Sequence, residues 1–229
     1  MAVHFAQVKL SNLILVNHEG EVVEGEYAVN QASFVLRAAV HTAHSDILAM
    51  CHAHTLYGAA YASLGRPLTP ISQDACAFFE DHAVIGDEAG QVAVERDAGV
   101  NIAPAFKGIT AAIHQNHGLF TASRHSIDAV AFRFMALERC CQQQLMVDAS
   151  GIRQSKSRPS GSATAESKLA ANISVGSASS PFTMIWCRPA PTCLVDVTAP
   201  EVQGRLIIGV YLVHAWGLGL TISVAYKVR

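Results

Sequence analysis

Three histidines in two separate segments carry the clearest chemical signal in the sequence. His52 and His54 follow an apolar run at 47–51 whose length and bounds are typical of a buried strand. Residues i and i+2 of an extended chain point to the same side, so both imidazoles can contact one ion. His117 follows a second strand-like segment, 111–115. Three neutral imidazoles with an open fourth position form catalytic zinc sites, so the pattern predicts Zn²⁺ or another divalent transition metal.

A plainer interpretation applies to histidines near the ends of strands. A single histidine there is usually a hydrogen-bonded polar residue, and the H-x-H pair alone leaves both interpretations open. His41 and His44 are expected on a helix as surface or packing residues. His114 precedes His117 by an odd number of positions, so in a strand it would face the opposite side and pack. Asn116 is expected to orient the His117 ring.

Several motifs agree in order and spacing along the first two thirds of the chain. They are H-A-H-T at 52–55, L-T-P-I-S at 68–72, N-H-G-L at 116–119 and the helix expected after His117. Together they resemble the class II aldolase/adducin family over about residues 3–148. The resemblance implies an α/β fold with three layers, α/β/α, and a mainly antiparallel central sheet. We expect that domain at 1–150 and a segment of different character at 151–229.

The resemblance also implies roles for individual residues. The family holds a divalent metal, usually zinc, on three histidines that match His52, His54 and His117. Its enzymes use an acidic residue 19 positions before the first of these, where this chain has Ser33. Without that carboxylate, a general acid/base contribution of roughly 10²–10⁴-fold is missing. Restoring it by Ser33→Glu is expected to bring an acidic group toward the metal.

Recognition of a substrate phosphate is not expected. Gln31 and Ala32 stand where the family's sugar-phosphate enzymes carry phosphate-binding serines, and the family's early G-N-x-S loop would precede the first residue. The expected substrate is therefore a small unphosphorylated hydroxy-carbonyl or carboxylate compound, used in lyase-type chemistry. Asp74, Glu80 and Asp81 are available as substitute acids, although the sequence does not place them near the metal.

Functions from other classes stay open. Adducins share this domain and bind the actin cytoskeleton without catalysis, and Ser33 in place of the acid agrees with that function. Their lysine-rich tail, however, has no counterpart in this sequence. A truncated, inactive homologue is a further alternative. If the protein is an enzyme, the resemblance implies a small-molecule substrate and a homotetramer, and the atypical ends predict that assembly is weakened.

Hydrophobic periodicity and capping residues predict the elements that position the histidines. A hairpin is expected at 13–16 and 21–23 with Gly20 in its turn, and Asn30 is a good N-cap for a helix to about Ala43. Further expected elements are helices at 55–64, at 73–80 after Ser72 and from Ser126 to about Asp148, and a strand at 83–85.

The composition excludes some classes of protein. The chain has 229 residues, 51% of them hydrophobic and 15% charged, which indicates a globular domain with a sizeable core. A net charge of −2 gives no basic stripe, so we expect no nucleic-acid partner. The six cysteines form no C-x-x-C pair and the first 20 residues lack the pattern of a signal peptide. These features predict free thiols and a cytoplasmic location.

The last third of the sequence differs from the first two. Residues 151–181 are rich in Ser, Ala, Gly and Lys, which is typical of a linker. Residues 206–226 carry no acidic side chain, Lys or Arg, and they have the minimum length for a membrane span. Three glycines and several polar residues in this stretch make it only moderately apolar. A disordered or aberrantly encoded tail is therefore an alternative to membrane contact.

Overall fold

The computed structural model describes residues 13–86, 102–152, 206–208 and 223–227. The strands are β1 (Ile14–Val16), β2 (Val22–Glu24), β3 (Ala49–Ala53), β4 (His82–Ile85), β5 (Ala111–His114), β6 (Gly118–Ser123), β7 (Leu206–Ile208) and β8 (Ser223–Lys227). The helices are α1 (Gln31–Ala43), α2 (Leu56–Ala62), α3 (Gln73–Cys76), the 3-10 turn η4 (Ala103–Phe106) and α4 (Ile127–Ala149).

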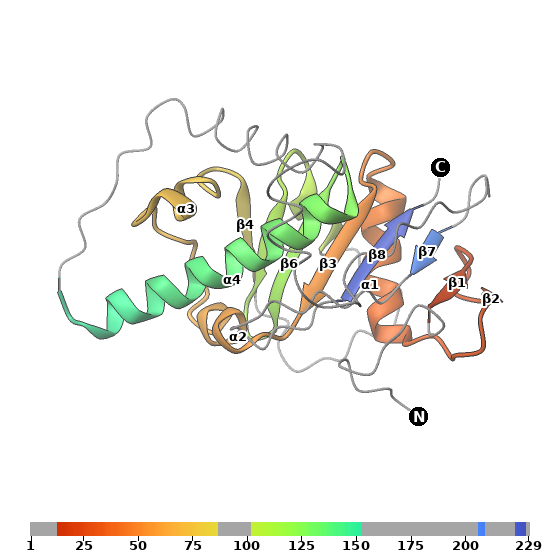
Figure 1. Ribbon diagram of the computed structural model, residues 1–229, viewed down its shortest axis with the longest axis horizontal. Coiled ribbons are helices and arrows are strands. Elements are labelled where there is room, and N and C mark those ends of the chain that lie inside the picture. Colours follow the sequence, from red (N-terminus) through yellow and green to blue (C-terminus); the bar gives the residue numbers. More distant parts are fainter. Residues whose placement is uncertain (1–12, 87–101, 153–205, 209–222, 228–229) are drawn as a thin grey trace, which may run out of the picture.

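The strands form one sheet that is covered on both faces (Figure 1). Its order is β2-β1-β7-β8-β3-β6-β5-β4, and every neighbouring pair is antiparallel except β4 and β5. Helix α4 crosses one face together with α2, whereas α1 lies against the other. The predicted α/β/α layering with a mainly antiparallel sheet is therefore confirmed.

The helices begin where the capping residues predict. The side chains of Asn30, Ser72 and Ser126 each accept a hydrogen bond from a backbone N–H in the first turn of α1, α3 and α4. These bonds satisfy N–H groups that have no partner inside the helix. Helix α3 is shorter than expected, because it ends at Cys76 and the chain continues as turns to residue 80. Glu80 lies in those turns with a φ of 58°.

The larger hydrophobic core lies between the sheet and the layer of α2 and α4. Alternate residues of the central strands point into it, among them Cys51 of β3 and Ile113 of β5, and they pack on Phe134 of α4. Full burial of one such side chain stabilises the fold by roughly 1.5–3 kcal/mol. Gly58 allows α2 to approach β6, since a Cβ there would lie 2.6 Å from the side chain of Leu119.

A buried carboxylate joins α4 to the start of α2. Glu138 is 2% exposed and accepts hydrogen bonds from the Thr55 hydroxyl, the Tyr57 N–H at 3.0 Å and the Gly58 N–H at 2.7 Å. Thr55 is the N-cap of α2 but makes no side-chain capping bond to that helix. Glu138 therefore supplies the negative charge and the acceptors that the N-terminus of α2 requires.

The opposite face of the sheet packs against α1 and η4. Leu36 and Val40 of α1 contact a cluster that contains Met50 of β3 and Phe120 of β6. Since side chains alternate along a strand, His52 shares the face of Met50 and is directed toward the α1 layer. This face therefore holds the first residue of the predicted metal site.

Two short strands of the C-terminal segment belong to the same sheet. β7 pairs with β1, and β8 pairs with both β7 and β3. Both ends of the stretch 206–226 are thus strands, while its middle and residues 153–205, which include most of the predicted linker at 151–181, lie outside the described residues. None of the helices described is long and apolar enough to span a bilayer.

The cysteines of the described segments agree with the predicted free thiols. Cys51, Cys76, Cys140 and Cys141 are all buried, and none of them forms a disulfide. Burial raises the pKa of the Cys140 thiol to about 12, so this thiol stays protonated and unreactive at neutral pH. Cys187 and Cys193 lie outside the described residues.

Candidate metal centre

His52 is fixed by its neighbours on the sheet. It is the fourth residue of β3 and stands opposite Phe120 of β6, whose ring stacks on the imidazole at a centroid distance of 3.9 Å. Its Nδ1 lies 2.8 Å from the carbonyl oxygen of Leu119. A carbonyl only accepts, so Nδ1 carries the proton and Nε2 is left with a lone pair. This arrangement orients an imidazole for metal binding.

His54 and His117 lie in two loops, one directly after β3 and the other directly before β6. His54 follows the last residue of β3 and is exposed, just before α2 begins. His117 lies in the tight turn between β5 and β6, where its N–H donates to the His114 carbonyl at 3.1 Å. Asn116 makes the turn possible with a left-handed φ of 55°, a conformation that asparagine tolerates better than most residues.

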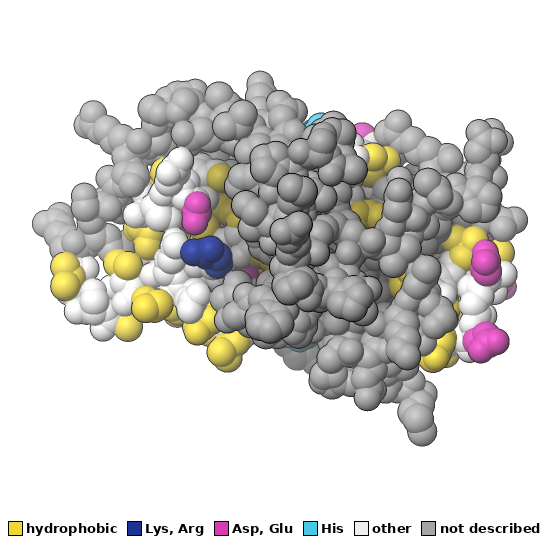
Figure 2. All heavy atoms as spheres, in the orientation of Figure 1, with side chains coloured by type: hydrophobic (Ala, Val, Ile, Leu, Met, Phe, Trp, Pro, Cys, Tyr) yellow, Lys and Arg dark blue, Asp and Glu magenta, His cyan; other side chains and the backbone are white. Residues whose placement is uncertain are grey.

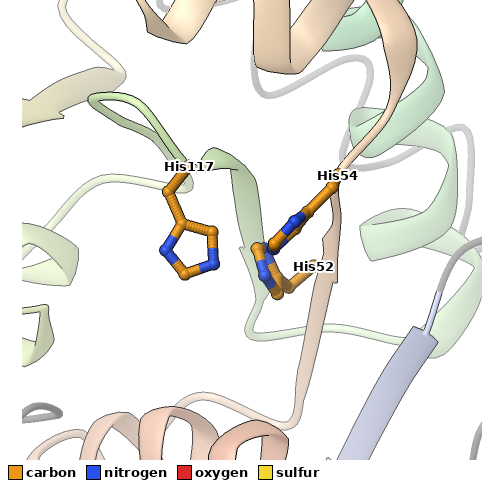
Figure 3. Close-up of side chains that lie close together, drawn as sticks. All are labelled: His52, His54 and His117. Atoms are coloured by element: carbon orange, nitrogen blue, oxygen red, sulfur yellow. The ribbon is translucent and has the colours of Figure 1, made fainter. Parts of the chain in front are cut away.

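The three predicted histidines lie together in the folded chain. One ring nitrogen from each of His52, His54 and His117 is within 4.8 Å of the others. The ring centroids are 5.0 Å apart for His52 and His54, 5.0 Å for His52 and His117, and 4.4 Å for His54 and His117. Figure 3 shows the rings directed toward a common space between the end of β3 and the turn before β6.

Electrostatics keep these imidazoles neutral. Burial is the main cause of a lowered pKa for His52, and the positive charge of Arg37 adds to it. His54 is exposed but partly shielded from water by its surroundings, and this partial burial also lowers its pKa. For His117, burial and then the neighbouring His54 and His114 lower the pKa to about 4. Neutral imidazole is the form that binds metals, so the donor set fits a divalent transition ion at neutral pH.

The prediction that His114 faces away from His117 is wrong. The two ring centroids are 4.7 Å apart. The chain does not continue as a strand after His114 but reverses in the turn, and this brings the His117 ring back beside it. Asn116 is exposed, and among the hydrogen bonds of the described residues none joins its side chain to His117. The backbone of the turn, rather than the Asn116 amide, places the His117 ring.

The other histidines near α1 have structural roles. His41 is buried with its Nδ1 at 3.1 Å from the carbonyl oxygen of Ile47. The Nε2 of His44 lies 2.7 Å from the carbonyl oxygen of Ala103. Both rings tie α1 to neighbouring loops, as expected for packing residues, and neither belongs to the cluster of three.

None of the substitute acids lies beside the cluster. The Asp81 carboxylate accepts hydrogen bonds from Thr110 at 2.9 and 2.6 Å and from Arg133 at 3.1 Å. It precedes β4 at the end where that strand pairs with the start of β5, whereas His117 follows the other end of β5. Asp74 lies in α3, and Glu80 is exposed in the turns after it.

A residue missed by sequence reasoning lies one helical turn after Ser33. Arg37 of α1 is only 2% exposed, and its guanidinium donates to the Ser33 carbonyl at 3.0 Å and to the Ser33 hydroxyl. Burial lowers the pKa of Arg37 to about 10. An arginine within an otherwise apolar helix face was the available signal, because an arginine is seldom buried without a specific reason.

Comparison with known proteins adds to this geometry. Residues 1–145 match the family described as the Class II Aldolase and Adducin N-terminal domain. The chain belongs to this family. The family assignment therefore rests on most of the region that holds the sheet and the three histidines.

Curated relatives include both enzymes and adducins. The decarboxylase NovR of Streptomyces niveus is 42% identical over 148 residues, which are 64% of this chain and 54% of that protein. The 4-hydroxy-3-prenylphenylpyruvate oxygenase/4-hydroxy-3-prenylbenzoate synthase of Streptomyces roseochromogenus is 41% identical over 64% of this chain and 53% of its own. Mouse alpha-adducin is 30% identical over 64% of this chain and 20% of its own length. The chain thus spans about half the length of its enzymatic relatives.

Solved structures agree on the fold. The L-fuculose 1-phosphate aldolase from Glaciozyma antarctica PI12 superposes with a TM-score of 0.62 at 35% identity, over 75% of this chain and 64% of that one. An aldolase II superfamily protein from Pseudomonas syringae gives a TM-score of 0.65 at 24% identity, over 81% and 71% of the two chains. These similarities confirm the class II aldolase fold expected from the sequence.

Proposed function

We propose that the chain is a divalent-metal-dependent enzyme of lyase type that acts on a small hydroxy-carbonyl or carboxylate substrate. The observation that carries the proposal is the convergence of ring nitrogens from His52, His54 and His117 to within 4.8 Å. Zn²⁺ or another divalent transition metal would be held by these three residues. Bound there, it would polarise a substrate carbonyl or hydroxyl as a Lewis acid.

The names of the relatives support this substrate class. One relative is called a decarboxylase, and the name of another contains a phenylpyruvate, which is a 2-oxo carboxylate. Ser33 at the family's acidic position weighs against cleavage of a sugar phosphate by the family's usual acid/base group. The protein's own residues contribute the oriented His52 imidazole and an α1 face that carries Ser33 and Arg37 rather than a carboxylate.

Metal content and substrate turnover test this function. The purified chain is refolded with Zn²⁺, Mn²⁺ or Fe²⁺ and assayed for bound metal, and then for cleavage of 2-oxo and 2-hydroxy acids. We expect near-stoichiometric metal in wild type and its loss in His52→Ala and His117→Ala. His125→Ala is the matched control, since His125 is exposed beyond the far end of β6. Retention of metal in both cluster variants would refute the assignment.

The non-enzymatic alternative rests on one observation, the absence of a carboxylate at position 33. Alpha-adducin is 30% identical to this chain, so a binding function for the same domain is a second proposal. Co-sedimentation with actin filaments separates the two. Binding to filaments by a protein that turns over no 2-oxo or 2-hydroxy acid would favour the adducin-like function.

We also propose that the chain self-associates, and that it is located in the reducing cytoplasm. Three large apolar side chains on and around α2 and α4 are strongly exposed: Leu56 (76%), Met146 (66%) and Ile152 (75%). Figure 2 shows apolar side chains scattered over this part of the described surface, with isolated charged groups among them. Light scattering of the full chain tests the tetramer expected from the family, and the effect of Met146→Lys on mass would locate the contact.

A further inference from the structure

Helix α2 contacts the chain close to each of the three histidines, although it contributes none of them. It begins two residues after His54. Its Gly58 packs on the side chain of Leu119, the residue whose carbonyl oxygen accepts the hydrogen bond from His52. Its C-terminal end meets the turn that carries His117. One helix therefore touches the supports of all three candidate ligands.

The C-terminal end of α2 and the turn of His117 are joined by a backbone hydrogen bond and a side-chain contact. The carbonyl of Ala62, the last residue of α2, accepts a hydrogen bond from the Asn116 N–H at 3.4 Å. Three residues further on, the chain leaves the helix at Gly65 with a left-handed φ of 58°. The Gln115 amide lies against this glycine, since a Cβ at position 65 would be 2.7 Å from both its Cδ and its Nε2. The missing side chain at position 65 thus makes room for the amide.

The same turn also touches the loop that carries His54. A Cβ at Gly118 would lie 2.8 Å from the Ala53 carbonyl oxygen and 3.5 Å from the His54 Cα. The turn is therefore packed against the end of β3 as well as the end of α2. Such close packing transmits strain, so a displacement of Gln115 is expected to move the backbone of His117, two residues further along the chain.

We propose that Gln115 is a positioning residue for the metal centre, because its amide, seated against Gly65 at the end of α2, fixes the His117 ring relative to the His54 ring. The inference rests on the proposed function, in which the two rings share one ion. His117 projects from the turn toward the other two histidines (Figure 3), and its ring centroid lies 4.4 Å from that of His54. Residues that orient metal ligands typically contribute roughly 10–100-fold to metal affinity.

A substitution at the glycine tests this contact. Gly65→Ala places a Cβ against the Gln115 amide, so the turn must shift, and zinc affinity measured by competition with a chelator should fall roughly 10–100-fold. The absorption spectrum of the Co²⁺-loaded chain should change as well, because it reports the geometry of the ligands. Gly108→Ala is the matched control, since residue 108 also has a positive φ, of 79°, but a Cβ there meets open space.

Removal of the Gln115 side chain separates positioning from a general loss of stability. Gln115→Ala alone should weaken zinc binding to a smaller extent, because the turn loses its contact with α2 without being pushed. In the double variant Gly65→Ala/Gln115→Ala the steric conflict is absent, so zinc affinity should equal that of Gln115→Ala. The backbone strain at residue 65 stays in the double variant, so the destabilisation by Gly65→Ala should persist in urea unfolding.

The outcomes separate this inference from the proposed function. Unchanged zinc affinity in Gly65→Ala, an equal loss in Gly108→Ala, or a loss that persists fully when Gln115 is replaced would overturn the role of Gln115. Failure of wild type to bind a divalent transition metal would instead refute the metal centre. The nuclear Overhauser effect between the ring protons of His54 and His117 then tests the positioning in metal-free protein. It should weaken in Gly65→Ala but not in Gly108→Ala, and equal effects in both variants would overturn the inference.

Discussion

Each of the two layers that flank the sheet contains a charged residue that is only 2% exposed, and the surroundings of these two residues differ. On the α4 side, Glu138 receives three hydrogen bonds from the start of α2. On the α1 side, Arg37 is as deeply buried, and burial lowers its pKa to about 10. The first charge completes a helix terminus, whereas the second is held in a form that its surroundings disfavour.

The difference separates a structural charge from a functional one. A buried charge with several well-placed partners stabilises a fold when the alternative is to leave those partners unsatisfied. A buried charge whose ionised form is disfavoured persists when binding or catalysis requires it, and such groups cluster at functional sites. We therefore expect substitutions at Glu138 to affect folding and substitutions at Arg37 to change the pKa of His52.

The largest expected effect on stability is that of Glu138→Met. The substitution leaves the Thr55 hydroxyl and the N–H groups of Tyr57 and Gly58 without their acceptor, which should cost roughly 3–5 kcal/mol. Urea unfolding monitored by circular dichroism measures the loss. Arg139→Met is the control on the exposed side of the same helix. A change below roughly 1 kcal/mol would mean that water replaces the carboxylate at the start of α2.

Gly58→Ala is expected to affect both the packing of α2 on one face of the sheet and the metal centre on the other. The added Cβ would lie 2.6 Å from Leu119 Cγ and Cδ1, an overpacking that costs roughly 1–3 kcal/mol. Because the Leu119 carbonyl accepts the hydrogen bond from His52, a shift of Leu119 should also weaken zinc binding. Competition with a chelator measures the affinity. Gly86→Ala, where a Cβ meets open space, should leave both quantities unchanged.

The pH dependence of the metal-free protein should show a smaller effect. The folded-state pKa of His117 is about 4, below the ordinary value of 6.5, so its neutral ring contributes stability above pH 6.5. That contribution is lost as the pH falls from 6.5 through 4, because the unfolded chain binds the proton first. Urea midpoints of wild type and His117→Gln should therefore converge across this window. A constant difference between them would contradict the lowered pKa.

The smallest effect on stability is expected for Arg37→Met, the counterpart of Glu138→Met. Methionine removes both the contacts of the guanidinium and the cost of burying its charge, so the free energy of unfolding should change by less than about 1 kcal/mol. The same variant should raise the pKa of His52, because the charge of Arg37 contributes to lowering it. A destabilisation equal to that of Glu138→Met would make Arg37 a structural residue and would remove the contrast between the layers.

Local signals in the sequence predicted much of the fold. The caps Asn30, Ser72 and Ser126 and the apolar periodicity place helix starts correctly, because capping and amphipathicity depend on residues a few positions apart. The H-x-H spacing and the family resemblance also predicted that the three histidines form one site. Strand ends fix the direction of neighbouring side chains, and only one long-range pairing, β3 with β6, was then needed.

Tertiary structure alone decided the features that depend on contacts between distant segments. The turn at Asn116 reverses the chain, so His114 lies beside His117 although strand parity predicted the opposite. Glu138 meets the start of α2 from about 80 residues away in the sequence, and the packing of α1 on the sheet brings the charge of Arg37 near enough to lower the pKa of His52. The sequence by itself determined the residue types and their local geometry. Which distant residues they contact was decided only by the folded chain, and these contacts determine how deeply each side chain is buried and whether it stays charged.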